Sequence, residues 1–227
     1  MSLLNDTIRG IDRIREQSDT AMLFCSWGKD SLVLLDLLYP RFDKVICVFM
    51  YFVPGLEHIE KYIRWAKAKY PGIEIDQIPH WNLTYILQSG MFCVANPKVK
   101  LLNLADIDSA MRLKHNTGYA FYGMKKADSL NRRLMLGTYE NYENKGKVYP
   151  LADWKQGDVL TYMKHHKLPQ PVRYSKKASG GVCFDIDCFL WMRENYPEDL
   201  QKVLKVFPAS EKILYEHDIK HQNGKAS

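Results

Sequence analysis

Apolar and polar positions change their spacing repeatedly over the first 140 residues, between the period of a strand and that of a helix. Short apolar runs predict strands at 21–25, 44–52, 73–78 and 119–124. Helical spacing predicts helices over 2–17, 32–38, 56–70 and 127–136, with mostly helical structure over 82–116. Strands that alternate with helices indicate an α/β fold with a parallel sheet of about five strands sandwiched by helices.

The rest of the chain is predicted to be mostly helical. A short strand is expected at 148–151, and a loop that contains glycine at 173–181. A length of 227 residues, 46% of them hydrophobic, fits one domain over 1–227. We divide it into an N-terminal helix at 1–19, an α/β core at 20–154 and a helical C-terminal extension at 155–227.

The composition argues against a membrane or secreted protein. No apolar run approaches the ~20 residues of a membrane span, and the N-terminus lacks a signal-peptide pattern. Five cysteines are an odd number, and Cys25 and Cys47 lie in apolar strand-like runs where buried thiols are expected. We therefore expect a cytoplasmic protein without a disulfide framework.

Positive charge is concentrated in the second half of the chain. The net charge is +6, and residues 112–177 contain fourteen Lys and Arg against five Asp and Glu. This excess favours a polyanionic partner, either nucleotide phosphates or nucleic acid. The alternative is an ordinary solvated surface, because the charges are scattered among aromatic residues.

The turn after the first strand carries the clearest chemical signal. Ser26-Trp27-Gly28-Lys29-Asp30-Ser31 separates an apolar strand from a helix. Backbone N–H groups, a helix N-terminus and the Lys29 ammonium would together form an anion site. Asp30 and Ser31 are also good N-cap residues, which is the structural alternative. The Walker pattern GxxxxGK[ST] is absent from the sequence.

This turn resembles the SGGKDS-type loop of the ATP pyrophosphatases, within the adenine nucleotide α-hydrolase superfamily. Trp27 makes it most similar to the phosphoadenosine phosphosulfate (PAPS) reductase branch. The resemblance implies that the loop embraces nucleotide phosphates, and it identifies Ser26, Trp27, Gly28, Lys29, Asp30 and Ser31 as binding residues.

The turn after the second strand resembles the family only in part. The family has Asp-Thr-Gly there, whereas this chain has Val53-Pro54-Gly55. Gly55 would let the backbone approach a ligand closely, although Pro-Gly is also an ordinary turn.

A second anion site is predicted after the fourth strand. Gly123, Ser129 and Arg132 match the family, and Lys125 and Lys126 replace its arginine. Because both segments follow strands of a parallel sheet, these cations should face the turn at 26–31. A solvated helix start is the alternative. The stretch from Tyr149 to Pro169 also resembles the family, with Asp153 expected to cap a helix near 155.

Two cysteines lie in the predicted C-terminal extension. Cys183 and Cys188 are five positions apart, wider than the Cys-x-x-Cys of relatives, and no metal site is predicted. The resemblance implies a Glu-Cys-Gly-x-His tail in sulfonucleotide reductases, but no cysteine follows Cys188. Cys183 is thus the candidate thiol nucleophile.

Three functions follow from the resemblance. The first is an enzyme that cleaves ATP to AMP and pyrophosphate to activate an acceptor, a nucleic acid or protein, possibly in sulfur transfer. Lys29, Asp30 and Cys183 would be catalytic, with Mg²⁺ near Asp30. The second is a PAPS or adenosine phosphosulfate (APS) reductase or sulfotransferase that uses Cys183. The third is an inactive regulator that binds nucleotide or nucleic acid. The oligomeric state is left open.

Overall fold

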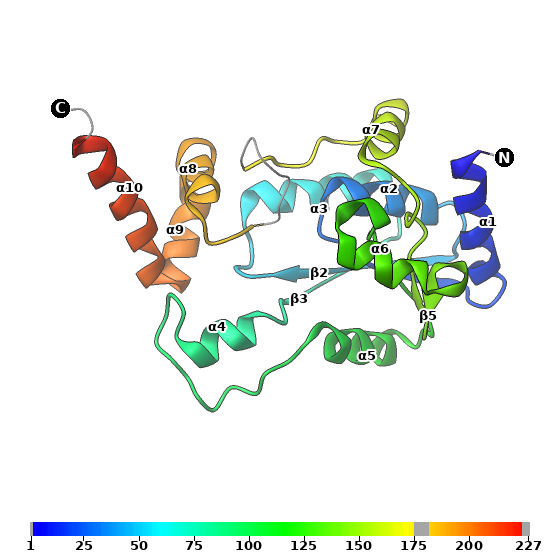
Figure 1. Ribbon diagram of the computed structural model, residues 1–227, viewed down its shortest axis with the longest axis horizontal. Helices are drawn as coiled ribbons and strands as arrows, with labels where there is room; N and C mark the ends of the chain where they lie inside the picture. Colours follow the sequence, from blue (N-terminus) through cyan, green and yellow to red (C-terminus); the bar gives the residue numbers. More distant parts are fainter. Residues whose placement is uncertain (1, 175–181, 224–227) are drawn as a thin grey trace. The chain divides into compact units, whose positions relative to one another are not determined.

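A single mixed sheet organises the computed structural model, which describes residues 2–174 and 182–223 (Figure 1). Its described strands run in the order β3-β2-β1-β4-β6-β5. Their bounds are β1 Thr20–Phe24, β2 Lys44–Tyr51, β3 Glu74–Pro79, β4 Ala120–Phe121, β5 Glu143–Asn144 and β6 Lys147–Val148. Strand β1 pairs in parallel with β2 and β4, and β4 with β6, whereas β5 is antiparallel to β6. The predicted α/β fold is confirmed, with a mostly parallel sheet of six described strands where a parallel sheet of about five was predicted.

The helices of the described residues largely follow the predicted ranges. They are α1 Leu3–Arg15, α2 Lys29–Leu38, α3 Glu57–Lys69, α4 Leu83–Ser89, α5 Leu104–His115, α6 Leu130–Gly137, α7 Gln156–His165, α8 Ile186–Asn195, α9 Pro197–Val206 and α10 Glu211–Asn223. Short 3₁₀ turns are η1 Lys126–Asp128, η2 Glu140–Tyr142 and η3 Pro208–Ser210. The helical C-terminal region is confirmed. Residues 175–181 of the predicted loop lie outside the described residues.

Three sequence predictions were wrong in detail. Helix α2 begins at Lys29, inside the predicted turn, rather than at residue 32. The predicted strand at 119–124 is regular only over Ala120–Phe121. The predicted helix at 127–136 is divided, because Ser129 is extended and caps α6 by accepting a hydrogen bond from the Arg132 amide. The short strand expected at 148–151 is β6, which lies over Lys147–Val148, whereas β5 was missed because a two-residue strand has no detectable periodicity.

The chain forms two compact units. One comprises Met1–Met50, Tyr62–Ile78 and Ala105–Pro171, and contains most of the sheet. In it, α2 and α7 lie on one side of the sheet and α5 on the other (Figure 1). The apolar runs of β1 and β2 are therefore buried, as parallel strands between helices require. The second unit comprises Tyr51–Lys61, Pro79–Leu104 and Val172–Ser227, and is mainly helical.

Candidate functional site

The turn between β1 and α2 leaves backbone donors exposed at a helix start. Gly28 is the N-cap residue of α2 and has no side chain with which to cap it. Asp30 and Ser31 lie inside the first helical turn, so the alternative that they are the N-cap is wrong. The Ser31 hydroxyl donates instead to the Gly28 carbonyl, at 3.0 Å. The first amides of α2 therefore lack intrahelical acceptors, which is the arrangement that anions bind.

Trp27 adopts an unusual conformation in this turn. Its φ is +59°, in the left-handed region that non-glycine residues occupy at a cost of about 1–3 kcal/mol. Its ring is 2% exposed and packs on Phe49, and its indole N–H has no hydrogen-bond partner among the described residues. A strained residue with an unpaired buried donor is typical of a ligand-binding turn.

Charged groups from two segments meet beside the turn. The Lys29 ammonium lies 2.8 Å from Asp30 Oδ2, and the buried Lys125 ammonium lies 2.7 Å from Asp30 Oδ1. The latter contact is too poorly aligned for a hydrogen bond and is therefore an ion pair. Lys125 also lies 2.9 Å from Asp128, which in turn pairs with Arg132 at 2.7 Å. Three cations thus alternate with two carboxylates.

Gly123 makes this approach possible. A Cβ atom built on Gly123 would lie 3.2 Å from the Asp30 Cβ and 3.4 Å from the Ser31 amide nitrogen. The segment after β4 and the start of α2 therefore touch backbone to backbone, as the predicted glycine allows.

The other predicted cation is directed elsewhere. Lys126 pairs with Asp153 at 2.9 Å and donates to the Tyr142 hydroxyl at 2.7 Å. Asp153 is engaged in this group and does not cap α7, which contradicts the sequence prediction. The N-cap of α7 is Lys155, whose amide donates to the Asp158 carboxylate.

Much of the basic charge at 112–177 is also neutralised within the protein. Arg112 pairs with Asp108, and Lys114 with Asp76. The predicted nucleic-acid surface therefore has fewer available cations than the sequence count suggests.

Two cysteines of the second unit, five positions apart in sequence, lie close together in the turn that begins α8. Cys183 is partly exposed and donates a hydrogen bond to Asp185 at 2.8 Å, and Cys188 is buried in the first turn of α8. Contact with Cys188, burial and the Asp185 carboxylate raise the pKa of Cys183. The hydrogen bond from Cys183 lowers the pKa of Cys188, against the effect of burial. Cys183 therefore rests as the thiol.

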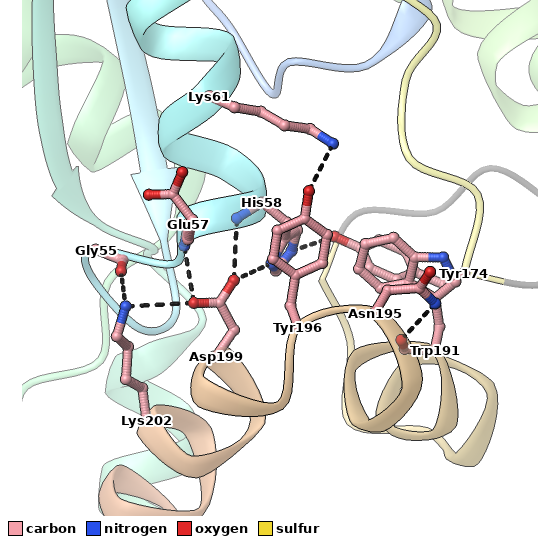
Figure 2. Close-up of polar contacts among 10 residues, drawn as sticks. All are labelled: Gly55, Glu57, His58, Lys61, Tyr174, Trp191, Asn195, Tyr196, Asp199 and Lys202. Atoms are coloured by element: carbon pink, nitrogen blue, oxygen red, sulfur yellow. Dashed lines mark hydrogen bonds and ion pairs between the residues drawn. The ribbon is translucent and has the colours of Figure 1, made fainter.

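Sequence reasoning missed a buried network around His58 in the second unit. Figure 2 shows Asp199 of α9 turned toward the first turn of α3, where its carboxylate accepts from the Glu57 and His58 amides. It also lies 2.6 Å from His58 Nδ1, and His58 Nε2 lies 2.7 Å from the Tyr174 hydroxyl. Burial lowers the pKa of His58. No local motif signals this network, because His58 and Asp199 are 141 positions apart.

Gly55, a predicted binding residue, lies in the same unit. It has a φ of +68°, and its carbonyl accepts a hydrogen bond from the Lys202 ammonium. It is used as a turn residue with positive φ, as glycine readily allows.

Metal ligands do not cluster in the described part of the chain. No three His, Cys, Asp or Glu side chains gather there closely enough to hold an ion. Asp30 and Asp128 already contact Lys125, so these carboxylates alone do not provide a metal site. Nor does any helix of residues 2–174 and 182–223 have the length and apolar character needed to cross a membrane.

Residues 20–177 match the family model of the phosphoadenosine phosphosulfate reductase domain. The chain belongs to this family. It is thus a PAPS reductase-domain protein of the adenine nucleotide α-hydrolase superfamily, and the resemblance inferred from the motifs is confirmed. The family consists of enzymes that bind adenine nucleotides.

Two similar proteins are named as APS reductases. Adenosine 5′-phosphosulfate reductase 2 of Bacillus subtilis (strain 168) is 29% identical over 165 residues, 68% of this chain and 67% of the relative. Adenosine 5′-phosphosulfate reductase of Geobacillus thermodenitrificans (strain NG80-2) is 30% identical over 171 residues, 71% and 70% of the two chains. A weaker likeness, with 17% identity and a TM-score of 0.49, is to the NH3-dependent NAD synthetase of Campylobacter jejuni, covering 97% and 96% of the chains.

Proposed function

We propose that this PAPS reductase-domain protein binds an adenosine phosphosulfate at residues 26–31 and transfers its sulfo group to a thiol. The proposal depends on the row of cations beside the start of α2, formed by Lys29, Lys125 and Arg132. These charges and the amides of α2 would bind the phosphate and sulfate oxygens. The indole N–H of Trp27 would supply one more donor.

The relatives favour a sulfonucleotide over ATP as the substrate. Both similar proteins carry the name of APS reductase, at 29% and 30% identity. At this identity the reaction is not transferred automatically, and because residues 1–227 contain no Glu-Cys-Gly-x-His motif, the candidate thiol is sought among the five cysteines of this sequence.

Cys183 is our candidate for this thiol. Cys183 is partly exposed, and its thiol would lose its proton to water, because the Asp185 carboxylate raises the pKa of this thiol rather than activating it. The sulfur of Cys183 would then attack the sulfate sulfur, forming an S–S bond while the S–O bond to the phosphate breaks. The electron pair would remain on the leaving nucleotide phosphate, and nearby cations such as Lys29 would stabilise its charge.

Cleavage of ATP to AMP and pyrophosphate is the second candidate. The observation that favours it is the turn itself, because Ser26 and Gly28 to Ser31 resemble the ATP pyrophosphatase loop. Mg²⁺ would accompany the nucleotide through its phosphates, since Asp30 is engaged by two lysines.

The deciding experiment offers the full chain three substrates separately: labelled APS, labelled PAPS and ATP, the first two with a dithiol reductant. We expect sulfite and AMP from APS, or sulfite and adenosine 3′,5′-bisphosphate from PAPS. Lys29→Ala should abolish most turnover, whereas Lys164→Ala, which replaces an exposed lysine of α7, should not.

Each outcome assigns one function. AMP and pyrophosphate from ATP, with the sulfonucleotides left intact, would replace the proposal by the second candidate. Tight binding of a nucleotide without any product would favour the regulator hypothesis. Sulfite formation that persists in Cys183→Ser would retain the substrate but exclude Cys183 as the nucleophile.

A further inference from the structure

The two cysteines near the start of α8 contact each other. Asp185, the N-cap residue of α8, joins them: one carboxylate oxygen accepts from the Cys183 thiol and the other from the Cys188 amide, each at 2.8 Å. The Cys188 sulfur also lies within reach of Cys183, and this contact lowers the pKa of Cys188. One carboxylate thus holds both cysteines in the same turn.

The surroundings hold this turn in place. Phe184, between the two cysteines, stacks on Phe92 with ring centroids 5.0 Å apart and packs edge-on against Phe207 at 4.8 Å. These ring contacts fix Phe184 and thereby hold Cys183 and Cys188 in the same turn, outside the core of the sheet. Cys183 stays partly accessible while Cys188 is 0% exposed.

The remaining cysteines do not share this arrangement. Cys25 and Cys47 are 2% and 0% exposed within the sheet, where an external reagent cannot reach them. Cys93 is partly exposed, but its sulfur contacts the Ile86 carbonyl rather than a second thiol. An accessible thiol beside a buried one is found at Cys183 and Cys188.

We infer that Cys183 and Cys188 form a redox-active dithiol, which cycles between two thiols and an intramolecular disulfide by exchange with external disulfides. Cys183 is the more accessible of the two, so it reacts with the external disulfide first. Cys188 then attacks the mixed disulfide that forms on Cys183. The inference goes beyond the proposed sulfo transfer, since it requires no nucleotide.

The exchange balances in two steps. Cys183, which is partly exposed, first loses its proton to solvent. The Cys183 thiolate then attacks an external disulfide RSSR, forming a mixed disulfide and releasing RS⁻. Cys188 then loses its proton and its thiolate attacks the Cys183 sulfur, which forms the intramolecular bond and releases a second RS⁻; the two RS⁻ groups take up the two protons as RSH. One S–S bond forms, one breaks, and the external disulfide is reduced.

The test equilibrates the full-length protein with mixtures of reduced and oxidised glutathione, in the absence of nucleotide. Remaining thiols are alkylated, and the linked peptides are mapped by mass spectrometry. We expect a Cys183–Cys188 link that forms and disappears reversibly with the glutathione ratio. Cys93→Ser, the matched control, should keep the link, whereas Cys188→Ser should stop at a mixed disulfide on Cys183.

Three results would overturn the inference. The first is that the wild type forms no Cys183–Cys188 link at any glutathione ratio. The second is that one of these residues links to a different cysteine. The third is that iron or zinc copurifies with the wild type and is lost in Cys183→Ser. The first is measured on the wild type, so a variant that folds poorly does not affect it. Because no nucleotide is present, failure of the dithiol and failure of the proposed sulfo transfer are observed separately.

Discussion

The ammonium of Lys125 lies 2.7 Å from the carboxylate of Asp30, although 95 positions separate the two residues in the chain. Lys125 is 1% exposed, so this ion pair links the segment after β4 to the first turn of α2 inside the protein. The contact orients Asp30 between two lysines and places a second positive charge beside the turn at 26–31.

Replacing Lys125 with Met should lower stability. The apolar side chain fits the volume but leaves Asp30 and Asp128 with one cationic partner each. We expect a loss of about 2 kcal/mol in the free energy of unfolding, less than for a fully buried pair, because both carboxylates are partly exposed. Urea denaturation measures it. Lys126→Met, which removes a more exposed pair, should cost about 1 kcal/mol or less, and an equal loss in both variants would contradict the assignment.

Replacing Lys29 with Ala should weaken nucleotide binding. The loss of a charged hydrogen-bond donor costs about 1.5–3 kcal/mol, a roughly tenfold to hundredfold rise in Kd. Isothermal titration calorimetry with APS, PAPS and ATP measures this change. If Lys29→Ala binds as tightly as the wild type, the turn at 26–31 is not part of the nucleotide site. The control, Lys164→Ala, should leave Kd unchanged.

Gly123→Ala should disturb the junction of the two segments. The added methyl would press on the Asp30 side chain at 3.2 Å, and overpacking of this kind costs about 1–3 kcal/mol. Thermal unfolding and nucleotide titration should both show a loss. Gly118→Ala is the matched control, because a Cβ there meets nothing within 4 Å. Equal behaviour of the two variants would show that the close approach at Gly123 is unimportant.

The buried His58 should make stability depend on pH near neutrality. Burial lowers the pKa of His58 in the folded state, whereas the unfolded side chain titrates near 6.5. Below about pH 6.5 the unfolded chain therefore binds more protons than the folded protein. The stability that neutral, buried His58 contributes is complete above that pH and is lost as the pH falls.

Denaturation curves between pH 7.5 and pH 5 test this dependence. His58→Gln should flatten the slope of stability against pH, though His80, whose pKa burial also lowers, should leave part of it. His165→Gln, which replaces an exposed histidine, should retain the wild-type slope. An unchanged slope in His58→Gln would contradict the buried, neutral state of this side chain.

Asp185→Asn should make Cys183 more reactive. The carboxylate helps to raise the pKa of Cys183, and Asn removes its charge while it can still cap α8. We expect alkylation of Cys183 by iodoacetamide to become several-fold faster at pH 7.5, measured by peptide mass spectrometry. Asp187→Asn serves as the control, and slower alkylation in Asp185→Asn would instead indicate that the carboxylate activates the thiol.

Local sequence patterns predicted a large part of this protein. The apolar runs of β1 and β2 and the turn at 26–31 were identified because strand, turn and helix signals depend on neighbouring residues. The parallel sheet followed from the alternation of strands and helices. Family membership followed from the motifs at 26–31, 123–132 and 149–169, which recur in the family's order.

What the sequence left open was decided by contacts between distant segments. Lys125 and Lys126 are chemically identical neighbours, yet the first is buried against Asp30 and the second pairs with Asp153. Their directions depend on the 3₁₀ turn η1 and on which carboxylates the crossovers of the sheet bring near. His58 of α3 likewise meets Asp199 of α9 only because tertiary packing brings these two helices together. A pattern of residues reports local conformation, whereas ion pairs and buried hydrogen bonds form only when tertiary packing brings distant partners together and excludes water.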